Sequence, residues 1–352
     1  MATLEDVARK AQVSSMTVSR VLNGTGLVSP KTRQRVMEAV EELEYRTNML
    51  ARGLVTGRSN IIAYIVPDLS DPYFNVVFKS AETVCRENGV MAVFLSAENN
   101  AALHFALQMS IEHKFDGVIM HDLDPDDEML AQLEHNHIPC VLVDNERIVR
   151  HVATLDIDHA NAAEQVADYF ARQGYETIYC VHGPLTDTVD LPLDAPRRLN
   201  QRRIWRERSA GFARGLARHG LTPRMLLADR FEVGNGYLSS LSAAKQILEE
   251  KRWPAAVYCE DDVLALGVSG YMQERGVLFP DQLAIIGNDG LEMSTTLYPR
   301  VSCILHPREL IGRRANEMLL AIIHGHAPVT HEYADVQMFW GDTTRSPETE
   351  TK

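Results

Sequence analysis

Cysteine is scarce in this sequence. Five occur among 352 residues, each alone within an apolar stretch, and none has the C-x-x-C or zinc-finger spacing of a redox or metal site. We therefore expect reduced thiols in the core rather than disulfides or metal ligands. These cysteines are Cys85, Cys140, Cys180, Cys259 and Cys303.

Long apolar runs are missing as well. The first thirty residues contain no apolar segment typical of a secretory signal, and no later run is long enough to cross a bilayer. The expected location is the cytosol. The glycine-rich phosphate-binding motifs G-x-G-x-x-G and the P-loop are also absent.

No set of residues predicts catalysis or metal binding. Asp122, Asp124 and Asp126 imitate the start of a calcium loop, but Asp127 stands where the turn glycine belongs and Leu133 where the bidentate glutamate belongs. Two His-x-His pairs lack the i, i+4 spacing of a helical metal pair, and solvated faces explain them. They are His135 with His137 and His324 with His326. We expect no enzyme, no cofactor and no metal.

Negative charge exceeds positive charge in this sequence, but the excess is not spread evenly along the chain. The formal net charge is -13, whereas residues 1–58 hold nine Lys and Arg against six Asp and Glu, a net +3. The remainder holds 26 against 42, a net -16. A basic segment attached to an acidic body is typical of a DNA-binding regulator, because the basic part contacts phosphates and the acidic part limits indiscriminate adhesion.

Residues 3–24 predict two short helices joined by a tight turn. Thr3 and Asp6 form a capping-box pair at the start of the first helix, and Ser14 is placed to cap the second. The apolar residues of both helices fall on one face, and the outward side is polar and basic. This pattern predicts a helix-turn-helix, whose second helix enters the major groove of DNA. The alternative is an amphipathic hairpin with no DNA role.

The same segment closely resembles the N-terminus of the LacI/GalR family of bacterial repressors. The matching residues are Asp6-Val7-Ala8, Val13-Ser14, Thr17-Val18-Ser19-Arg20-Val21-Leu22-Asn23 and Val28-Ser29. The resemblance implies a homodimeric transcriptional repressor that binds palindromic operator DNA under the control of a small polar metabolite, a sugar or sugar derivative. A co-repressor response to a nucleobase or a phosphorylated metabolite, and a plain solute-binding protein, are the alternatives.

Ser15, Met16 and Arg20 are the predicted base readers. Because Met16 has no strong hydrogen-bond donor, we expect it to read groove shape or a thymine methyl group. Thr17, Ser19 and Asn23 are expected nearer to phosphates, and Thr3 and Ser14 complete this part of the predicted DNA-binding set.

A third helix over 32–43 completes a head-piece of residues 1–45. Ser29 is its predicted cap and Pro30 lies in its first turn. The family usually carries glycine where this chain has Gln12 and Glu44, which places strain on two left-handed positions.

Residues 46–58 match the hinge helix of the family. The resemblance assigns minor-groove contacts to Asn48, Ala51 and Leu54, with Leu54 as the wedge that opens a base step. Thr47 replaces the usual proline, and a plain linker is the alternative.

From Ile61 onward, apolar strands alternate with amphipathic helices. Two doubly wound α/β lobes are therefore predicted over 59–346, and the resemblance implies the type I periplasmic-binding-protein-like fold. Strands are expected at 61–66, 90–95, 117–120, 139–143, 177–182, 255–259, 284–287 and 336–339. Helices are expected at 74–88, 101–114, 126–136, 160–173, 209–219, 236–251, 262–275 and 310–323. Residues 347–352 are expected to be a disordered tail, and since no leucine heptads follow the lobes we expect a dimer.

Ligands of open α/β sheets bind beyond the carboxyl ends of the strands. In the first lobe this favours Asp71, Tyr73 and Phe74, which follow the first strand, and Asp144, which follows a later one. An equal alternative for Phe74 is packing within its own lobe.

In the second lobe, Arg208 matches a family arginine that holds effector hydroxyls or carboxylates in a forked hydrogen bond. The resemblance adds the aromatic Phe231 and the strand-end acids Asp261 and Asp289; the family often has asparagine at the position of Asp261. His306 completes the predicted effector set, with a solvent-facing histidine as the alternative.

The segment before Gly211 is longer than in typical members and rich in arginine. These side chains either attract an anionic effector or pair with acids on a solvated surface, which we favour. The arginines are Arg197, Arg198, Arg202, Arg203, Arg206 and Arg208, and the acids are Asp187, Asp190, Asp194 and Glu207.

Overall fold

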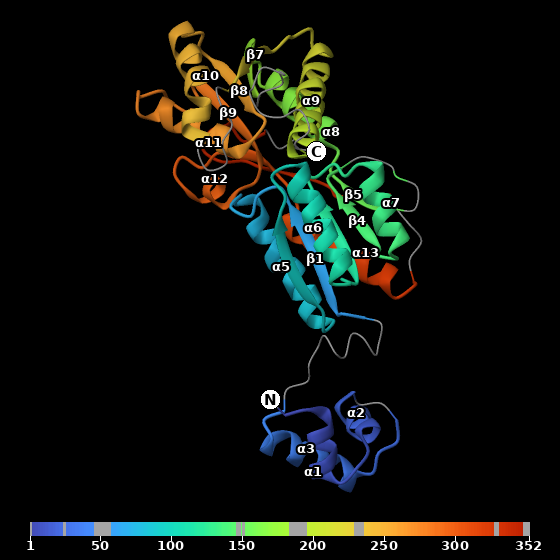
Figure 1. The fold of residues 1–352 in the computed structure, drawn as a ribbon. Coiled ribbons are helices and arrows are strands. Elements are labelled where there is room, and N and C mark those ends of the chain that lie inside the picture. The colour runs from blue at the N-terminus through green and yellow to red at the C-terminus, as the bar shows by residue number, and fades with distance from the viewer. Residues whose placement is uncertain are drawn as a thin grey trace, which may run out of the picture. The chain divides into compact units, whose positions relative to one another are not determined.

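The computed structural model contains two compact units, residues 1–59 and 60–352. It describes residues 2–23, 26–45, 58–145, 149, 152–182, 196–228, 236–326 and 331–347, and the side chains of residues 23, 196–202, 236 and 237 lie outside this description. Figure 1 draws both units.

The first unit is a bundle of α1 (Leu4–Ala11), α2 (Ser15–Asn23) and α3 (Pro30–Glu42). Val7, Val18 and Val36, one from each helix, are fully buried and meet in a single core. The predicted caps are present: Thr3 and Asp6 form a capping box, and the Ser29 hydroxyl accepts from the Thr32 amide. The third helix begins at Pro30 rather than at residue 32, because proline is pre-organised for the first turn of a helix.

The second unit contains two six-stranded sheets, which confirms the predicted two-lobe α/β fold. In the first lobe the strand order is β11-β5-β4-β3-β1-β2, and every pair is parallel. Its elements are β1 (Ile61–Val66), α5 (Tyr73–Glu87), β2 (Met91–Ser96), α6 (Asn100–Glu112), β3 (Gly117–His121), α7 (Asp127–His135), β4 (Cys140–Val143), β5 (Ala153–Asp156), α13 (Arg308–Ile323) and β11 (His331–Tyr333).

The second lobe has the order β12-β10-β9-β8-β6-β7, with β12 antiparallel to β10 and the other pairs parallel. Its elements are α8 (His159–Arg172), β6 (Thr177–His182), α9 (Pro196–Ala217), β7 (Arg224–Leu227), α10 (Gly236–Glu250), β8 (Ala255–Cys259), α11 (Asp262–Gln273), β9 (Leu283–Asp289), α12 (Glu292–Thr296), β10 (Ser302–Leu305) and β12 (Gln337–Phe339).

The chain passes between the lobes three times: after β5, after β10 and after β11. Consequently α13 lies against the lobe that contains β1, although it follows β10 of the other lobe (Figure 1). All five cysteines are buried and free, as expected. Among the described residues, no helix is long and apolar enough to cross a membrane.

The sequence patterns did not predict several short elements, and one helix is longer than predicted. Strands β5, β7, β10 and β11 have only three or four residues, too few for an alternating pattern to stand out. The helix predicted from Ser209 begins at Pro196, so α9 has 22 residues. Its first three turns are rich in arginine and polar residues, and such a stretch has no apolar stripe from which a helix could be recognised.

Candidate functional site

A cavity lies between the two lobes, beyond the carboxyl ends of their strands. Its volume is about 70 Å³, which is room for about five water molecules. The first lobe contributes Asp71, Pro72, Tyr73, Phe74, His121, Asp122 and Asp144, and the second contributes Ile204, Trp205, Arg208, Asp261, Val263, Asp289 and Leu291, with His306 at the crossover after β10. Eight of the nine predicted effector residues therefore line one cavity. Phe231 lies outside the described residues.

For His306 and Phe74 the sequence also allowed a role other than effector binding. His306 is 6% exposed, so the solvent-facing interpretation is wrong. Phe74 is 2% exposed; its ring stacks on Phe78 in the core of the first lobe, and it also lines the cavity.

Three of the lining aspartates follow or end strands and adopt left-handed backbone conformations. The φ angles of Asp122, Asp144 and Asp289 are 55°, 56° and 113°. Aspartate tolerates such angles better than most residues, but they still cost free energy, and residues held in this way concentrate at functional sites.

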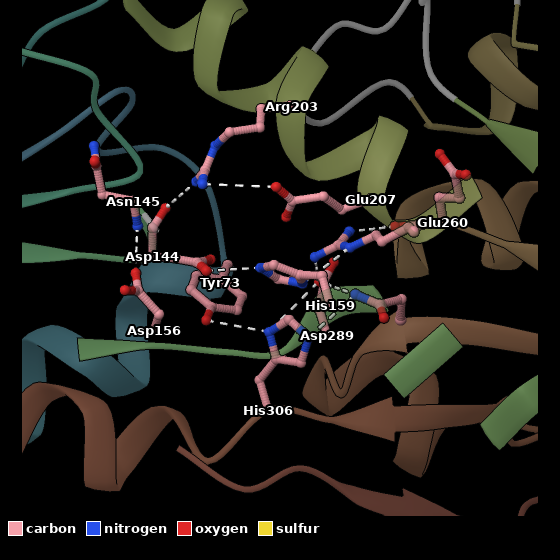
Figure 2. Close-up of polar contacts among 12 residues, drawn as sticks. Tyr73, Asp144, Asn145, Asp156, His159, Arg203, Glu207, Glu260, Asp289 and His306 are labelled. Atoms are coloured by element: carbon pink, nitrogen blue, oxygen red, sulfur yellow. Dashed lines mark hydrogen bonds and ion pairs between the residues drawn. The ribbon is translucent and has the colours of Figure 1, made fainter. Parts of the chain in front are cut away.

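Arg208 is the centre of a buried polar network, and its partners His159, Glu260 and Asp289 are labelled in Figure 2. Its Nε donates to His159 Nδ1 at 3.3 Å, its Nη2 to Asp289 Oδ1 at 3.4 Å, and its Nη1 to the carbonyl oxygen of Glu260. Because a guanidinium only donates, His159 Nδ1 accepts, which leaves the Nε2 proton of His159 for Asp144 Oδ1 at 2.6 Å. A tight helix crossing makes this possible: Gly211 of α9 meets the backbone of Ala160 in α8, where an added Cβ would overlap.

The network joins the lobes directly. The His159–Asp144 bond connects the start of α8 to the end of β4, and Tyr73 Oη lies 3.3 Å from His306 Nδ1. Arg203 Nη2 donates to the carbonyl oxygen of Asp144 at 3.4 Å (Figure 2). Polar contacts between the lobes therefore close the cavity.

Burial sets the protonation of these groups. Burial raises the pKa of Asp289 to about 6, against the opposing effect of Arg208. It also raises the pKa of Asp261 well above its usual range, and the charge of Asp289 adds to this effect. Burial acts in the same direction on Asp144, but its contact with His159, which donates a hydrogen bond to the carboxylate, outweighs burial and holds the pKa of Asp144 low. Burial lowers the pKa of His121 to about 4 and that of His306 well below its usual value, so both rings are neutral at neutral pH.

Several residues of the site were not predicted. His121 ends β3 and Asp122 follows it, so the strand-end rule that found Asp144 could have found both. His159 of the polar network and the cavity residues Ile204 and Trp205 carry no such signal, because they lie on helices and only the crossing of these helices brings them to the site.

The arginines before Gly211 do not all fit one of the two interpretations, attraction of an anionic effector or pairing with acids on a solvated surface. Arg206 is exposed, as a solvated surface requires. Arg208 is buried and Arg203 is half-buried, and Arg203 lies 3.7 Å from Glu207 while reaching Asp144. For Arg208 the solvated interpretation is therefore wrong, whereas Arg203 makes the ion pair with Glu207 that this interpretation predicts. The side chains of the other three arginines lie outside the described residues.

The first unit presents α2 as a candidate DNA-reading helix. Met16 is 65% exposed and Arg20 is exposed, while Val18 and Val21 face the core. Ser14 Oγ accepts from the Thr17 amide at 3.2 Å, and the two hydroxyls lie 2.9 Å apart, so both residues cap the helix that carries the predicted base readers. The predicted hinge residues Asn48, Ala51 and Leu54 lie outside the described residues, as does the side chain of Asn23.

Comparison with known proteins gives matches along nearly the whole chain. Residues 3–48 match the profile described as bacterial regulatory proteins, lacI family, and residues 167–344 match the periplasmic binding protein-like domain. Catabolite control protein A of Priestia megaterium is 30% identical over 90% of this chain and 91% of that protein. The HTH-type transcriptional repressor PurR of Aliivibrio salmonicida is 30% identical over 91% and 92%, respectively. The HTH-type transcriptional repressor CytR of Escherichia coli is 28% identical over 98% and 97%.

Solved structures agree on the fold. A lac repressor dimer bound to operator and the anti-inducer ONPF superposes with a TM-score of 0.82 at 23% identity, covering 98% of this chain and 99% of that chain. A LacI-family transcriptional regulator from Silicibacter pomeroyi gives 0.80 at 26% identity, covering 98% and 100%. With a helix-turn-helix unit, a two-lobed body and relatives at 30% identity over nine-tenths of its length, this chain belongs to the LacI family of DNA-binding transcriptional regulators.

Proposed function

We propose that this protein is a cytoplasmic homodimeric repressor that binds a palindromic operator through α2 and is controlled by a small polar effector bound between the lobes. The observation that carries this proposal is the presence, in one chain, of an exposed polar α2 and a closed cavity lined by buried charged side chains from both lobes. The first supplies a DNA-reading surface and the second a ligand-dependent contact between two bodies.

On the DNA side, Ser15, Met16 and Arg20 are the base readers, and Ser19 and Asn23 hold phosphates. Thr17 lies near phosphate and Ser14 caps the helix with it. Thr3 caps α1, and its hydroxyl donates to Asp6 Oδ2 at 2.7 Å. Asn48, Ala51 and Leu54 form the minor-groove part of the same surface when paired hinge helices order on DNA.

On the effector side, a sugar or sugar derivative suits the cavity because its walls are rich in hydrogen-bonding groups. Arg208 and Asp289 form one polar wall, Asp144 lies opposite, and Tyr73 with Phe74 adds aromatic surface. An effector that replaces the His159–Asp144 and Tyr73–His306 contacts would change how the lobes are held. That change is the switch through which operator affinity is controlled.

Paired titrations of the intact protein test this mechanism. An operator is first selected from random duplex DNA, and small metabolites are then screened for release of that DNA on a gel. A ligand that weakens operator binding by a given factor must itself be bound more weakly, by the same factor, in the presence of operator. A factor of about 100 corresponds to about 2.7 kcal/mol of coupling. Failure to select any duplex, or titrations without reciprocity, would contradict the proposal.

A further inference from the structure

The cavity between the lobes carries more negative than positive charge. Its described lining contains five aspartates and one arginine: Asp71, Asp122, Asp144, Asp261, Asp289 and Arg208. The guanidinium of Arg208 already donates to Asp289, His159 and the carbonyl oxygen of Glu260. Two further arginines lie nearby: Arg203 donates to the carbonyl oxygen of Asp144, and Arg308 lies over the Tyr73 ring and donates to the carbonyl oxygen of Gly290.

Two of these carboxyl groups compete for ionisation. Burial raises the pKa of both Asp261 and Asp289; the charge of Asp289 raises the pKa of Asp261 further, and the charge of Asp71 raises both. Around Asp289 lie Arg208, Asn288 Nδ2 at 2.8 Å and His306 Nδ1 at 3.8 Å, and the ring of His306 is neutral. A cation bound between the two carboxylates would relieve their repulsion, whereas an anion would increase it.

A separate feature also indicates a ligand. His121 is fully buried and lines the cavity, and Tyr64 Oη lies 3.0 Å from its Nδ1. Its Nε2 has no hydrogen-bond partner within the described part of the chain. A buried ring nitrogen without a partner is costly, and a polar group of a ligand in this cavity would satisfy it.

The side chains that line the cavity favour some classes of ligand over others. Phosphorylated or carboxylated ligands would meet several carboxylates and an arginine that is already engaged. A bare divalent cation is not favoured, because no group of three or more His, Cys, Asp or Glu side chains in the described chain is arranged to hold a metal. A neutral polyol satisfies acceptors but leaves the charge uncompensated. An ammonium group provides three donors and a compact positive charge.

We propose that the effector carries a protonated amine, which binds between Asp261 and Asp289, together with hydroxyl groups that bind Asp144 and His121. An amino sugar is the simplest member of this class. The inference rests on the proposed effector site and names the chemistry that this site selects. Asp261 is the specificity-determining residue, because its carboxylate is one of the two that hold the amine and an asparagine at this position would remove it.

Matched pairs of sugars test the charge of the ligand. Calorimetry at pH 7 with the intact protein would compare D-glucosamine, D-galactosamine and D-mannosamine with D-glucose, D-galactose and D-mannose, and with the 6-phosphates of these three neutral sugars. At least one amine should bind tenfold or more tightly than its hydroxyl partner, and no phosphate should bind more tightly than its parent sugar. Tighter binding of a neutral or phosphorylated member, or no binding by any amine, overturns the proposal.

Substitution locates the amine. In Asp261→Asn, the preference for the amine over its hydroxyl partner should fall at least fivefold. The control is Asp281→Asn, which alters an exposed carboxylate on the same lobe, 77% exposed, and should keep the preference of the parent protein. An unchanged preference in Asp261→Asn overturns the assignment of this residue.

Operator release separates this proposal from the one on which it rests. If a neutral sugar binds and releases operator DNA, the proposal of an amine-bearing effector is wrong, whereas the proposal of a repressor controlled by an effector holds. If an amine binds tightly but operator binding never changes, the amine is right and the control of DNA binding fails.

Discussion

Glu260 is a buried carboxyl group that makes the stability of the body depend on pH. It directly follows β8 and is fully buried, with Ser209 donating to its Oε1 and Cys180 Sγ 3.7 Å away. Arg208 binds its backbone carbonyl, and its Oε2 has no hydrogen-bond partner among the described residues. Burial raises the pKa of Glu260 from 4.5 to about 8, against the hydrogen bond from Ser209.

Glu260→Gln should therefore gain stability relative to the parent as the pH becomes alkaline. Between pH 4.5 and 8 the folded parent keeps a proton that the unfolded chain has lost. Its free energy of unfolding thus falls through this window by at most about 1.4 kcal/mol per pH unit. Glutamine has no such proton, so urea unfolding at pH 5 and 8.5 should show the variant gaining a few kcal/mol relative to the parent. The exposed Glu249→Gln is the control; parallel pH profiles for Glu260→Gln and the parent would contradict the prediction.

In the first unit, a prediction at the level of a single residue concerns Arg20 and operator binding. Arg20→Ala should weaken operator binding by about 1 to 3 kcal/mol and relax sequence preference at one base pair. The measurement is binding to a set of single-base operator variants. Arg35→Ala removes another exposed arginine from α3 and serves as the control. An equal loss at every operator variant would instead identify Arg20 as a phosphate contact.

At the scale of elements, α1 has well-formed ends with one strained residue. Its capping box satisfies the first turn, and its C-cap residue Gln12 lies in the left-handed region at φ 51° and ψ 48°. The Gln12 amide donates to the carbonyl oxygens of Ala8 and Arg9, so the conformation closes the helix. Glu44 has a φ of 45° shortly after α3. Both positions confirm the expected left-handed backbone at which the family usually has glycine.

Gln12→Gly should stabilise the head-piece by about 0.5 to 1 kcal/mol, because glycine adopts this φ without the Cβ penalty. Hydrogen exchange of the amides of residues 4–11 in the intact chain would measure the effect as a two- to five-fold slowing. Gln12→Ala is the matched control, since alanine keeps the Cβ and should not slow exchange. Equal protection in the two variants would show that the left-handed backbone carries no cost.

At the scale of the molecule, the two lobes of the body are joined by three chain crossings and by side chains that meet across the cavity. The cavity of about 70 Å³ is small for a metabolite, since ligand sites usually measure about 300 to 1,000 Å³. The lobes must therefore separate to admit an effector. Tyr73 belongs to the contacts that oppose this opening, because its hydroxyl lies 3.3 Å from His306 Nδ1.

Tyr73→Phe should make the unliganded body open more readily. The ring contacts with Phe74, His121 and His306 remain, and one hydrogen bond worth about 1 kcal/mol is lost. This corresponds to about a five-fold increase in opening, read as faster hydrogen exchange of residues 302–308. Tyr298→Phe, which changes a tyrosine that is 82% exposed, should have no effect there. Unchanged exchange in Tyr73→Phe would show that the hydroxyl does not hold the lobes together.

Much of this protein follows from local sequence patterns. The capping residues of α1 and α3, the alternation of strands and helices, and the strand-end positions of Asp144 and Asp289 depend on neighbours within a few residues, so the sequence predicts them. Strands β1, β6 and β8 occupy the predicted residues because each is a continuous apolar run between turn signals. The family likewise follows from α2 and its flanking residues.

Tertiary structure alone decided which of these residues meet. The neutral state and burial of His306, the bond between His159 and Asp144, and the position of Arg203 depend on the crossing of α8 with α9 and on the return of the chain after β10. Such contacts join residues that are 15 to 233 positions apart, and no local pattern encodes them. The carboxylates of the cavity have the same origin: Asp144, Asp261 and Asp289 lie at or just after the ends of strands, and their pKa values are raised or lowered because two sheets bring them together away from water.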